Sequence, residues 1–569
     1  MAKSNWGTSG TVGLGAALLL GFYPIAAHAD GDKDERIHKL ETMMEEMHKE
    51  IHDQKSEIHA LRSAVGQTKS EATKTRRLVV ERGSQPQTVA SAVPPLPQGS
   101  LPVYLNANRG LQLGGISITP GGFLAAESVF RSKANGGEIA TAFGSIPFPN
   151  NPLSHTNEFR PTARQTRLAL LAEGAITPSM NIAGYAEFDF IGAAQTANSI
   201  QSNSYTPRIR NLYTTLDAND YGLHVLAGQN WSLVTLNSKG ITPRNEVLPP
   251  TIDASQMPGS IYARQAQIRV TKDFDKKLWL SLSAEESQTT FAGSCATANT
   301  AGGLTPATAN ANIVGVNNII CGAAETGGAF SSLTNESLNH APDVIGKVAY
   351  EARMGERDIH LEALGLYRNL YDRVTYTNGS STNLNSTGYG VGGGLIVPVL
   401  PRVLDFQINA LYGRGIGRYG PASLGDTTFS QNGALKPVEE VIALTGLVLH
   451  ASPAFDLYAF GGIERGMRSY FQSGANTVGN GAPFATNALG GTNDVGCYTQ
   501  GSTCSGTTKQ VYQLTAGMWD KIYKGSFGEL RAGLEYTYTN RQVFNTPGLY
   551  TPSTYAHSFY TSLRYYPFQ

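Results

Sequence analysis

The chain has 569 residues, a formal net charge of zero and 15% charged residues, whereas soluble proteins contain about 25%. This length exceeds one ordinary soluble domain, and the zero net charge argues against nucleic acid as a partner. Glycine (63) and tyrosine (26) are abundant, and the slightly negative mean hydropathy excludes a helical membrane protein.

Residues 1–29 have the features of a secretory signal peptide. Lys3 supplies a positive charge, "VGLGAALLLGFYPIAA" (12–27) is an apolar core, and "AHA" (27–29) offers small residues for cleavage. The alternative is a membrane anchor, but the apolar run is short of the roughly 20 residues that a span needs. We therefore expect an exported protein without a transmembrane helix.

Residues 30–82 are expected to form a periplasmic coiled coil. Apolar residues recur there every seven positions, at Ile37, Met44, Ile51, Ile58 and Val65. Four to five sustained heptads favour a coiled coil over a single amphipathic helix packed on a domain. Residues 83–103 are rich in Pro, Gly, Ser and Gln, which is typical of a linker.

Residues 104–569 contain short alternating segments, and the gaps between them alternate between short and long. The expected hairpins are 163–176 with 180–192, 208–217 with 221–231, 262–273 with 278–287, 343–353 with 357–371, 387–397 with 402–415, 439–451 with 455–471, and 511–523 with 528–544. The long gaps are 133–162, 193–206, 232–260, 288–340, 372–386, 416–437, 472–510 and 545–554. Short turns on one side and long loops on the other indicate an outer-membrane β-barrel rather than a soluble β-sandwich.

A leading strand near 115–131 and a closing strand at 555–568 bring the expected total to sixteen antiparallel strands. The predicted fold class is thus an all-β transmembrane barrel with an N-terminal α-helical coiled coil. In the closing strand, Phe559 and Leu563 share one face, while Tyr560, Ser562 and Arg564 share the other. This strand must pair with the first one, because a barrel spans lipid without an unpaired edge.

Alternate residues of a barrel strand face lipid and lumen, and a cationic side chain at the lipid-facing midplane costs about 2–4 kcal/mol. The alternation therefore predicts a set of polar side chains that line the lumen. This set is Arg167, Glu187, Asp189, Arg208, Arg210, Gln267 and Arg269, with Arg264 near the mouth on an undetermined face. Acidic and basic walls that face each other orient anionic solutes. Alternatively, the arginines pair with the carboxylates and stiffen the wall, and both interpretations can hold at once.

The loop 232–260 is the third long connection. In general porins the loop at this position folds back into the lumen and narrows it. Its charged residues Lys239, Arg244, Glu246 and Asp253 are then candidates for a constriction. An external loop is the alternative.

The four cysteines suit an oxidising compartment. Proximity favours Cys295 with Cys321 and Cys497 with Cys504, among the three pairings that the sequence permits. Zinc is disfavoured, because there is no CxxC spacing and no histidine cluster beside the cysteines. The chain also has no GxSxG, HExxH or Walker motif, so we expect neither an enzyme nor a cofactor or metal.

Several phrases resemble the DcaP-like family of outer-membrane porins. These phrases are "PRIRNLYTTLDANDYGLHVLAGQNWS" (207–232), "ARQAQIRVT" (263–271), "LYGRGIGRY" (411–419) and "SLRYYPF" (562–568). Within them the family pattern R-x-R matches Arg208 and Arg210, and RQ-x-Q-x-R matches Arg264, Gln265, Gln267 and Arg269. The resemblance implies a trimeric barrel with a periplasmic coiled coil and uptake of small anions such as dicarboxylates.

Three functions are considered from the sequence. The first is a porin in the outer membrane, in contact with lipid, that forms a homotrimer and passes small anionic solutes by diffusion. The second is a structural protein whose coiled coil contacts the cell wall and tethers the outer membrane to it. A barrel enzyme is the third and least favoured interpretation.

Overall fold

The computed structural model describes Lys49, Val103–Leu105 and residues 110–568, with gaps at 193–198, 255, 292–305, 310–311, 325–334, 483–495, 505 and 546–549. The barrel belongs to the compact unit Gly99–Gln569. The predicted signal peptide, coiled coil and linker lie outside the described residues, apart from Lys49 and Val103, and stay predictions. No helix among the described residues is long and apolar enough to cross a membrane.

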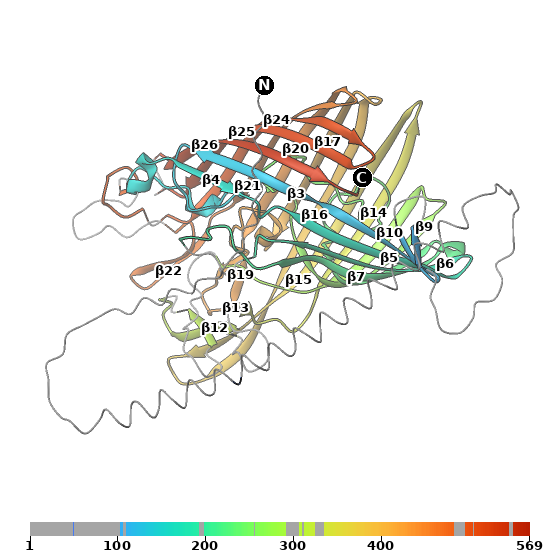
Figure 1. Cartoon of the computed structure of the whole chain (residues 1–569). Helices are drawn as coiled ribbons and strands as arrows, with labels where there is room; N and C mark the ends of the chain where they lie inside the picture. Colours follow the sequence, from blue (N-terminus) through green and yellow to red (C-terminus); the bar gives the residue numbers. More distant parts are fainter. Residues whose placement is uncertain are drawn as a thin grey trace, which may run out of the picture. The chain divides into compact units, whose positions relative to one another are not determined.

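Sixteen long antiparallel strands form a closed barrel within the described residues. They are β3 (Ile116–Arg131), β5 (Arg167–Thr177), β6 (Met180–Asp189), β7 (Arg208–Ala218), β8 (Leu223–Trp231), β9 (Arg264–Phe274), β10 (Leu278–Glu285), β14 (Asp343–Met354), β15 (Arg357–Tyr376), β16 (Ser381–Leu400), β17 (Leu404–Arg414), β20 (Glu439–Ser452), β21 (Phe455–Gly466), β24 (Thr508–Gly525), β25 (Gly528–Val543) and β26 (Ser553–Tyr566). Each of these strands pairs with the next one in chain order, and Figure 1 shows the long strands of the barrel. The predicted strand number and hairpins are confirmed.

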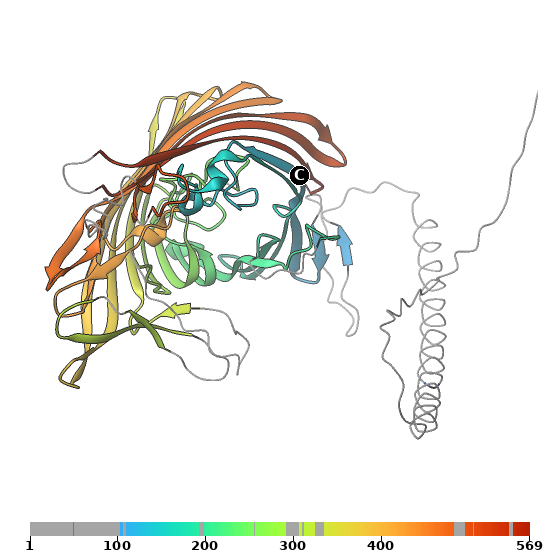
Figure 2. The ribbon, with the colours of Figure 1, turned by 90° about the vertical axis from the view of Figure 1, so that its left-hand side faces the viewer.

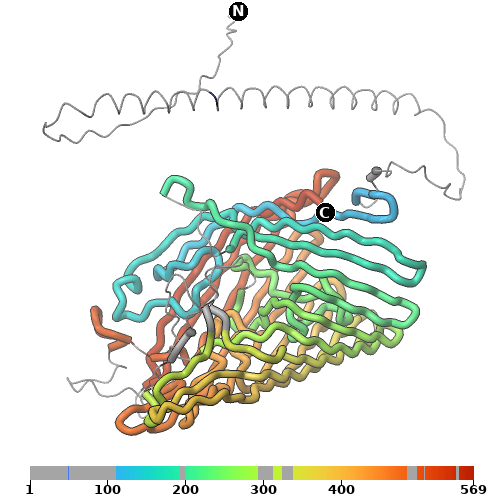
Figure 3. Tube along the Cα trace, turned by 90° about the horizontal axis from the view of Figure 1, so that it is seen from below, coloured from blue at the N-terminus to red at the C-terminus, as the bar shows by residue number. Residues whose placement is uncertain are grey.

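The last strand closes the barrel against the first. Residues Ser558 to Tyr565 of β26 pair with Arg131 to Leu124 of β3, and Figure 3 shows the chain passing around the barrel from blue to red. Phe559 is 53% exposed on the outer face, whereas Tyr560 is 1% exposed and points inward. Closure therefore satisfies the backbone of both terminal strands, and the alternation predicted for β26 is confirmed.

One predicted loop is wrong. Residues 372–386 were expected to be a long connection, but β15 continues to Tyr376 and β16 begins at Ser381, so a tight turn joins two 20-residue strands. The reason is tertiary, since β12 (Val316–Ala324) pairs with the far end of β15 and extends the sheet there. The local sequence of Asn, Ser and Thr does not reveal this partner.

The remaining short elements lie before β3, at the β7–β8 turn and in the long loops. The short strands are β1 (Val103–Leu105), β2 (Leu111–Leu113), β4 (Glu158–Thr162), β11 (Pro306–Ala309), β12, β13 (Asn335–Ser337), β18 (Thr427–Phe429), β19 (Leu435–Pro437), β22 (Ser469–Ser473) and β23 (Asn476–Asn480). The short 3-10 helices are η1 (Phe143–Ser145), η2 (Pro152–His155), η3 (Asn219–Tyr221), which lies at the β7–β8 turn, and η4 (Gly417–Tyr419). The predicted disulfide Cys497–Cys504 is present, with the two Cα atoms 4.4 Å apart. Cys295 lies outside the described residues, so its pairing with Cys321 stays a prediction.

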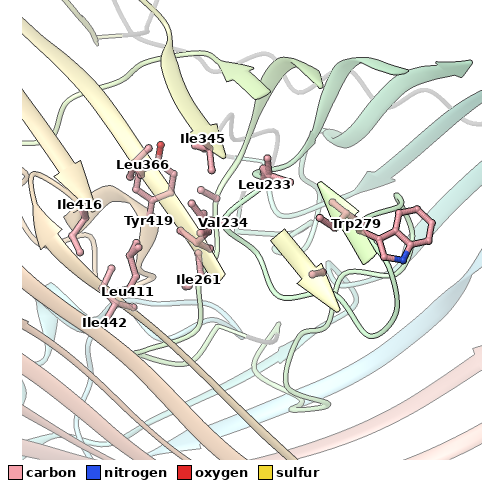
Figure 4. Close-up of a cluster of buried hydrophobic side chains, with 14 residues drawn as sticks. Leu233, Val234, Ile261, Trp279, Ile345, Leu366, Leu411, Ile416, Tyr419 and Ile442 are labelled. Atoms are coloured by element: carbon pink, nitrogen blue, oxygen red, sulfur yellow. The ribbon is translucent and has the colours of Figure 1, made fainter. Parts of the chain in front are cut away.

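Two clusters of buried apolar side chains lie inside the barrel, whose strands surround the interior in Figure 2. In the first, Leu233, Val234 and Ile261 from the segment after β8 pack against Leu366 and other inward residues of β10 to β20 (Figure 4). The second places Ile252 and Met257 of the same loop against inward residues of β20, β21, β24, β26 and β3. Much of the interior is thus a packed core, because inward loops bury apolar area there.

Candidate channel lumen

The polar residues predicted to face the lumen lie on its wall. Glu187, Asp189, Arg210, Gln267 and Arg269 are all buried. Their neighbours Leu168, Ile209 and Ile268 are exposed on the outer face. The alternation of each strand therefore directs charged side chains inward and apolar side chains outward, as the barrel requires.

A β-bulge brings one further residue to this wall. Glu187 pairs with Asn211 and Phe188 pairs with Ile209, so Arg210 is the extra residue of β7. Both Arg210 and Asn211 are buried, although they are adjacent in sequence. Sequence reasoning missed Asn211, because strict alternation places it outside. The sequence pattern that could have revealed Asn211 is that the apolar residues Ile209 and Leu212 are three positions apart instead of two or four, which a bulge explains.

The arginines of β7 pair with the carboxylates of β6. Arg208 donates from Nε and Nη2 to the two oxygens of Asp189, at 3.0 and 2.7 Å. Arg210 donates to Glu187 at 2.6 Å and to Asp189 at 2.8 Å, and the Tyr185 hydroxyl donates to Glu187 at 2.9 Å. Charge-assisted bonds of this kind stiffen the wall, so the pairing alternative holds for Arg208 and Arg210.

Three other arginines keep less compensated charges. Arg167 Nε lies 3.8 Å from Glu187 Oε1 and has no hydrogen-bond acceptor among the described residues. Arg264 lies over the ring of Trp231, 4.9 Å from its centre. Arg269 donates to Gln267 at 3.0 Å and to the Trp231 carbonyl at 2.6 Å. Within the described parts of the chain, no carboxylate oxygen lies within 4.0 Å of Arg264 or Arg269, so this wall carries an excess of positive charge.

The loop 232–260 lies inside the barrel, where wall glutamates accept hydrogen bonds from its backbone. The accepting residues are Glu285 for the Leu233 N–H (2.8 Å), Glu362 for Asn237 (3.1 Å), Glu351 for Gly240 (2.5 Å), Glu535 for Ile252 (2.6 Å) and Glu464 for Gly259 (3.2 Å). These glutamates come from β10, β14, β15, β21 and β25. The loop is therefore held at points spread around the wall, and its buried N–H groups find acceptors there.

Side-chain donors bind the carbonyls of the same loop. Lys347 donates to the Thr235 carbonyl at 2.6 Å and to Glu362 at 2.8 Å. Trp519 donates to the Pro250 carbonyl at 2.7 Å, and Asn409 donates to that of Gly259 at 3.1 Å. Side chains of the wall thus supply acceptors for the N–H groups of the loop and donors for its carbonyl groups.

The predicted constriction residues lie in different surroundings. Arg244 and Glu246 line a cavity, described below, whereas Lys239 is exposed on the loop. Asp253 is fully buried and accepts a hydrogen bond from Gln513 of β24 at 3.2 Å. Burial raises the pKa of the Asp253 carboxyl to about 6, because the charged form loses its hydration. Asp253 therefore belongs to the contact between loop and wall.

A cavity of about 390 Å³ lies between the loop and the arginine-bearing wall. Its lining includes Arg167, Tyr185, Glu187 and Arg210 of the wall and Arg244 of the loop. Arg244 has a left-handed backbone, with φ of 69°, and its side chain is held weakly, 3.5 Å from the Tyr213 hydroxyl and 3.8 Å from Glu173. A second cavity, of about 810 Å³, also includes Arg244 in its lining. Arg244 thus lies where the two cavities meet.

Among the described residues, no group of three or more His, Cys, Asp or Glu side chains is arranged to hold a metal ion.

Comparison with solved structures identifies the barrel. The outer membrane channel DcaP of Acinetobacter baumannii matches 79% of this chain over 98% of its own length, with a TM-score of 0.52 and 17% identity. This chain has the fold of an outer-membrane channel. The expected likeness to a DcaP channel is thus confirmed at the level of the fold.

Other matches are weaker. The anion-selective porin from Comamonas acidovorans covers 79% of this chain over 99% of its own, with a TM-score of 0.39 and 10% identity. The trimer form of OmpT from Vibrio cholerae covers the same shares with a TM-score of 0.38 and 10% identity. No protein-family model matches the chain, and neither does any curated protein sequence.

Proposed function

We propose that this barrel is a passive channel of the bacterial outer membrane that prefers small anionic solutes, with dicarboxylates as the substrate class. The observation that carries the proposal is the cavity of about 390 Å³ beside the arginine-bearing wall. Solutes move down their gradient through this passage, and no covalent chemistry is involved.

The packed interior supports the position of the passage. The first apolar cluster fills space along β10 to β20, and the second fills space along β20 to β26 and at β3. The charged cavity instead touches β5, β6, β7 and β8. A solute that crosses beside these strands passes the arginines and, in the same lining, the loop residues Leu248, Pro249 and Pro250.

The arginines of the cavity support the preference for dicarboxylates. Arg167 comes from the wall and Arg244 from the loop, and both line the same cavity. A guanidinium binds a carboxylate through two parallel hydrogen bonds, which a lysine ammonium does not reproduce. Two guanidinium groups on different elements can therefore engage the two ends of one dicarboxylate.

The same proposal includes the assembly. The outer face presents apolar side chains to lipid, among them Leu168, Ile268 and Phe559, as a membrane barrel requires. We further propose a homotrimer, in keeping with the resemblance of the sequence to trimeric porins.

Planar-bilayer recording of the purified full chain tests the proposal. In a KCl gradient we expect a reversal potential whose sign shows that chloride permeates more readily than potassium. We also expect openings in groups of three and a block of the current by added succinate. Replacing Arg167 and Arg244 together by Gln should abolish the anion preference and the block. Arg353→Gln is the matched control, because this side chain lies near the end of β14 and is 77% exposed. Cation preference, or silence from a correctly folded heat-modifiable barrel, would contradict the proposal.

A further inference from the structure

Residues 236–247 form a hairpin within the loop 232–260. The Ser238 N–H donates to the Asn245 carbonyl at 2.7 Å, and this bond joins the two arms of the hairpin. The second arm includes Arg244, which lines the cavity proposed above as the passage. Because the arms are bonded to each other, contacts of the first arm with the barrel wall also position Arg244.

Two glutamates of the wall hold the first arm of this hairpin. Oε1 of Glu362, on β15, accepts the Asn237 N–H at 3.1 Å. Oε1 of Glu351, on β14, accepts the Gly240 N–H at 2.5 Å. Gly240 also lies against Trp279 of β10, since a Cβ atom there would be 2.8 Å from the indole ring. Both ends of the arm are therefore fixed by charge-assisted hydrogen bonds.

His360 of β15 lies between these two glutamates. Its Nδ1 atom is 2.7 Å from Glu351 Oε1, and its Nε2 atom is 2.9 Å from Glu362 Oε1. These are the same two oxygen atoms that accept the N–H groups of the hairpin. His360 is 1% exposed, and its register partners are Glu351 on β14 and Ile396 on β16. The ring is thus a buried link between the two anchors of the hairpin.

The geometry identifies the charge of the His360 ring. An ionised carboxylate accepts hydrogen bonds and does not donate them, so both ring nitrogens carry a proton and the ring is an imidazolium. Lys347 of β14 also serves Glu362, with its Nζ atom 2.8 Å from Oε2. The charge of Lys239, on the hairpin, acts on Glu351, but within 4.0 Å His360 is the one ion-pair partner of Glu351 in the described part of the chain. When the ring loses a proton, Glu362 therefore keeps a close cation, whereas Glu351 faces a nitrogen lone pair.

We propose that His360 is a positioning residue of the channel, whose imidazolium form holds the hairpin 236–247, and with it Arg244, against the wall. Histidine is the side chain that most readily changes its charge near neutral pH. The docked hairpin favours the protonated ring, so the hairpin is held at low pH and released as pH rises. The consequence for anion preference rests on the function proposed above, whereas the link between His360 and the hairpin does not.

Hydrogen exchange of the detergent-solubilised full chain at pH 6.5 and pH 9.5 tests the proposal. Protection factors are compared, because they correct for the acceleration of exchange by base. We expect the protection of the Asn237 and Gly240 amides to fall about tenfold at the higher pH. The Leu233 amide is the internal control, because it binds Glu285, whose other donors are a serine and a glutamine. Its protection should not change.

Glu351→Gln separates the proton of His360 from the packing of its ring. A glutamine amide has an oxygen that can accept the Gly240 N–H and an NH2 group that can donate to the neutral ring. This variant should therefore keep the hairpin protected at both pH values. His360→Gln removes the cation, so protection should be low at both. The matched controls Glu356→Gln and His155→Gln change exposed residues and should behave as the wild type does.

Heat-modifiable migration on a gel verifies that each variant is folded. Equal protection of the wild-type hairpin at both pH values would overturn the proposal. The same loss of protection in the wild type and in Glu351→Gln would also overturn it, because another group such as Lys347 would then be responsible. These two comparisons test the proposal even if His360→Gln does not fold.

Bilayer recording measures the consequence for the channel. The anion preference in a KCl gradient should decrease between pH 6.5 and pH 9.5 in the wild type but not in Glu351→Gln. An unselective wild-type channel with pH-dependent protection would contradict the function proposed above and support the role of His360. Constant protection in an anion-selective channel would do the reverse, so the two proposals fail independently.

Discussion

Arg210 Nε lies 2.6 Å from Glu187 Oε1, and both side chains are buried where β7 meets β6. The bulge at Arg210 creates this contact, because it turns two successive residues of β7 toward the lumen. Asp189 accepts a second bond from the same guanidinium at 2.8 Å. Arg210 therefore contributes to the structure of the wall, while Arg167, which is held less closely, is the better candidate for contact with solutes.

Glu187→Gln should increase the anion preference of the channel several-fold. The substitution removes one negative charge from the cavity while Arg210 keeps its contact with Asp189. It should also lower stability, since breaking a buried pair costs about 3–5 kcal/mol. The reversal potential in a salt gradient measures the first effect, and thermal unfolding measures the second. An unchanged reversal potential, with Asp358→Asn as the control, would contradict the role of this cavity in selectivity.

Lys347→Met should release part of the loop 232–260. Lys347 is buried and binds the Thr235 carbonyl, Asn237 and Glu362, and its removal leaves Glu362 without its cation. We expect faster tryptic cleavage at the exposed Lys239 and a larger conductance. The double variant Lys347→Met/Glu362→Gln is the control and should recover part of the protection, because replacing both partners of a buried pair costs less than removing one. Equal cleavage of the wild type and the single variant would show that this contact does not hold the loop.

The docking of the loop should weaken as pH rises past the pKa of Asp253. Burial raises this pKa from 3.8 to about 6, so the docked loop favours the protonated acid. The contribution of the proton to stability is full below the unfolded pKa near 3.8, and it is lost as pH rises through about 6. Hydrogen exchange of residues 251–254 at pH 4.5 and 7.5 should give lower protection factors at the higher pH. Asp253→Asn should show the same protection at both values.

Gly462→Ala should displace the loop from the wall. A Cβ atom at Gly462 would lie 1.8 Å from the Pro258 carbonyl oxygen, which backbone atoms cannot accommodate without moving. Gly461→Ala is the matched control, because its Cβ would meet nothing closer than 3.2 Å, at the end of the Leu514 side chain. We expect a changed conductance and a lower unfolding temperature for Gly462→Ala alone. The same behaviour in both variants would mean that this contact does not position the loop.

Much of the barrel could be predicted from the sequence, because the alternation of a strand is a local property. Segments such as 180–192 reveal their lumenal face from the positions of Glu187 and Asp189 between apolar residues. The extension of β15 could not be predicted in this way, since it depends on pairing with β12. The position of Asp253 also differed from the expectation. Its charge marked it as a candidate for the constriction, whereas its contact with Gln513, 260 positions away, buries it against the wall.

The sequence by itself determined the number and order of the strands, the closure by β26 and the inward direction of Arg208 and Arg210. These features follow from two-residue periodicity and from the cost of a charge in lipid. The tertiary structure alone decided which arginines are neutralised, how the loop 232–260 is anchored and where the cavities lie. Those features depend on contacts such as that of Ile252 with Glu535, which join residues 283 positions apart, and local patterns carry no information about such distant pairs.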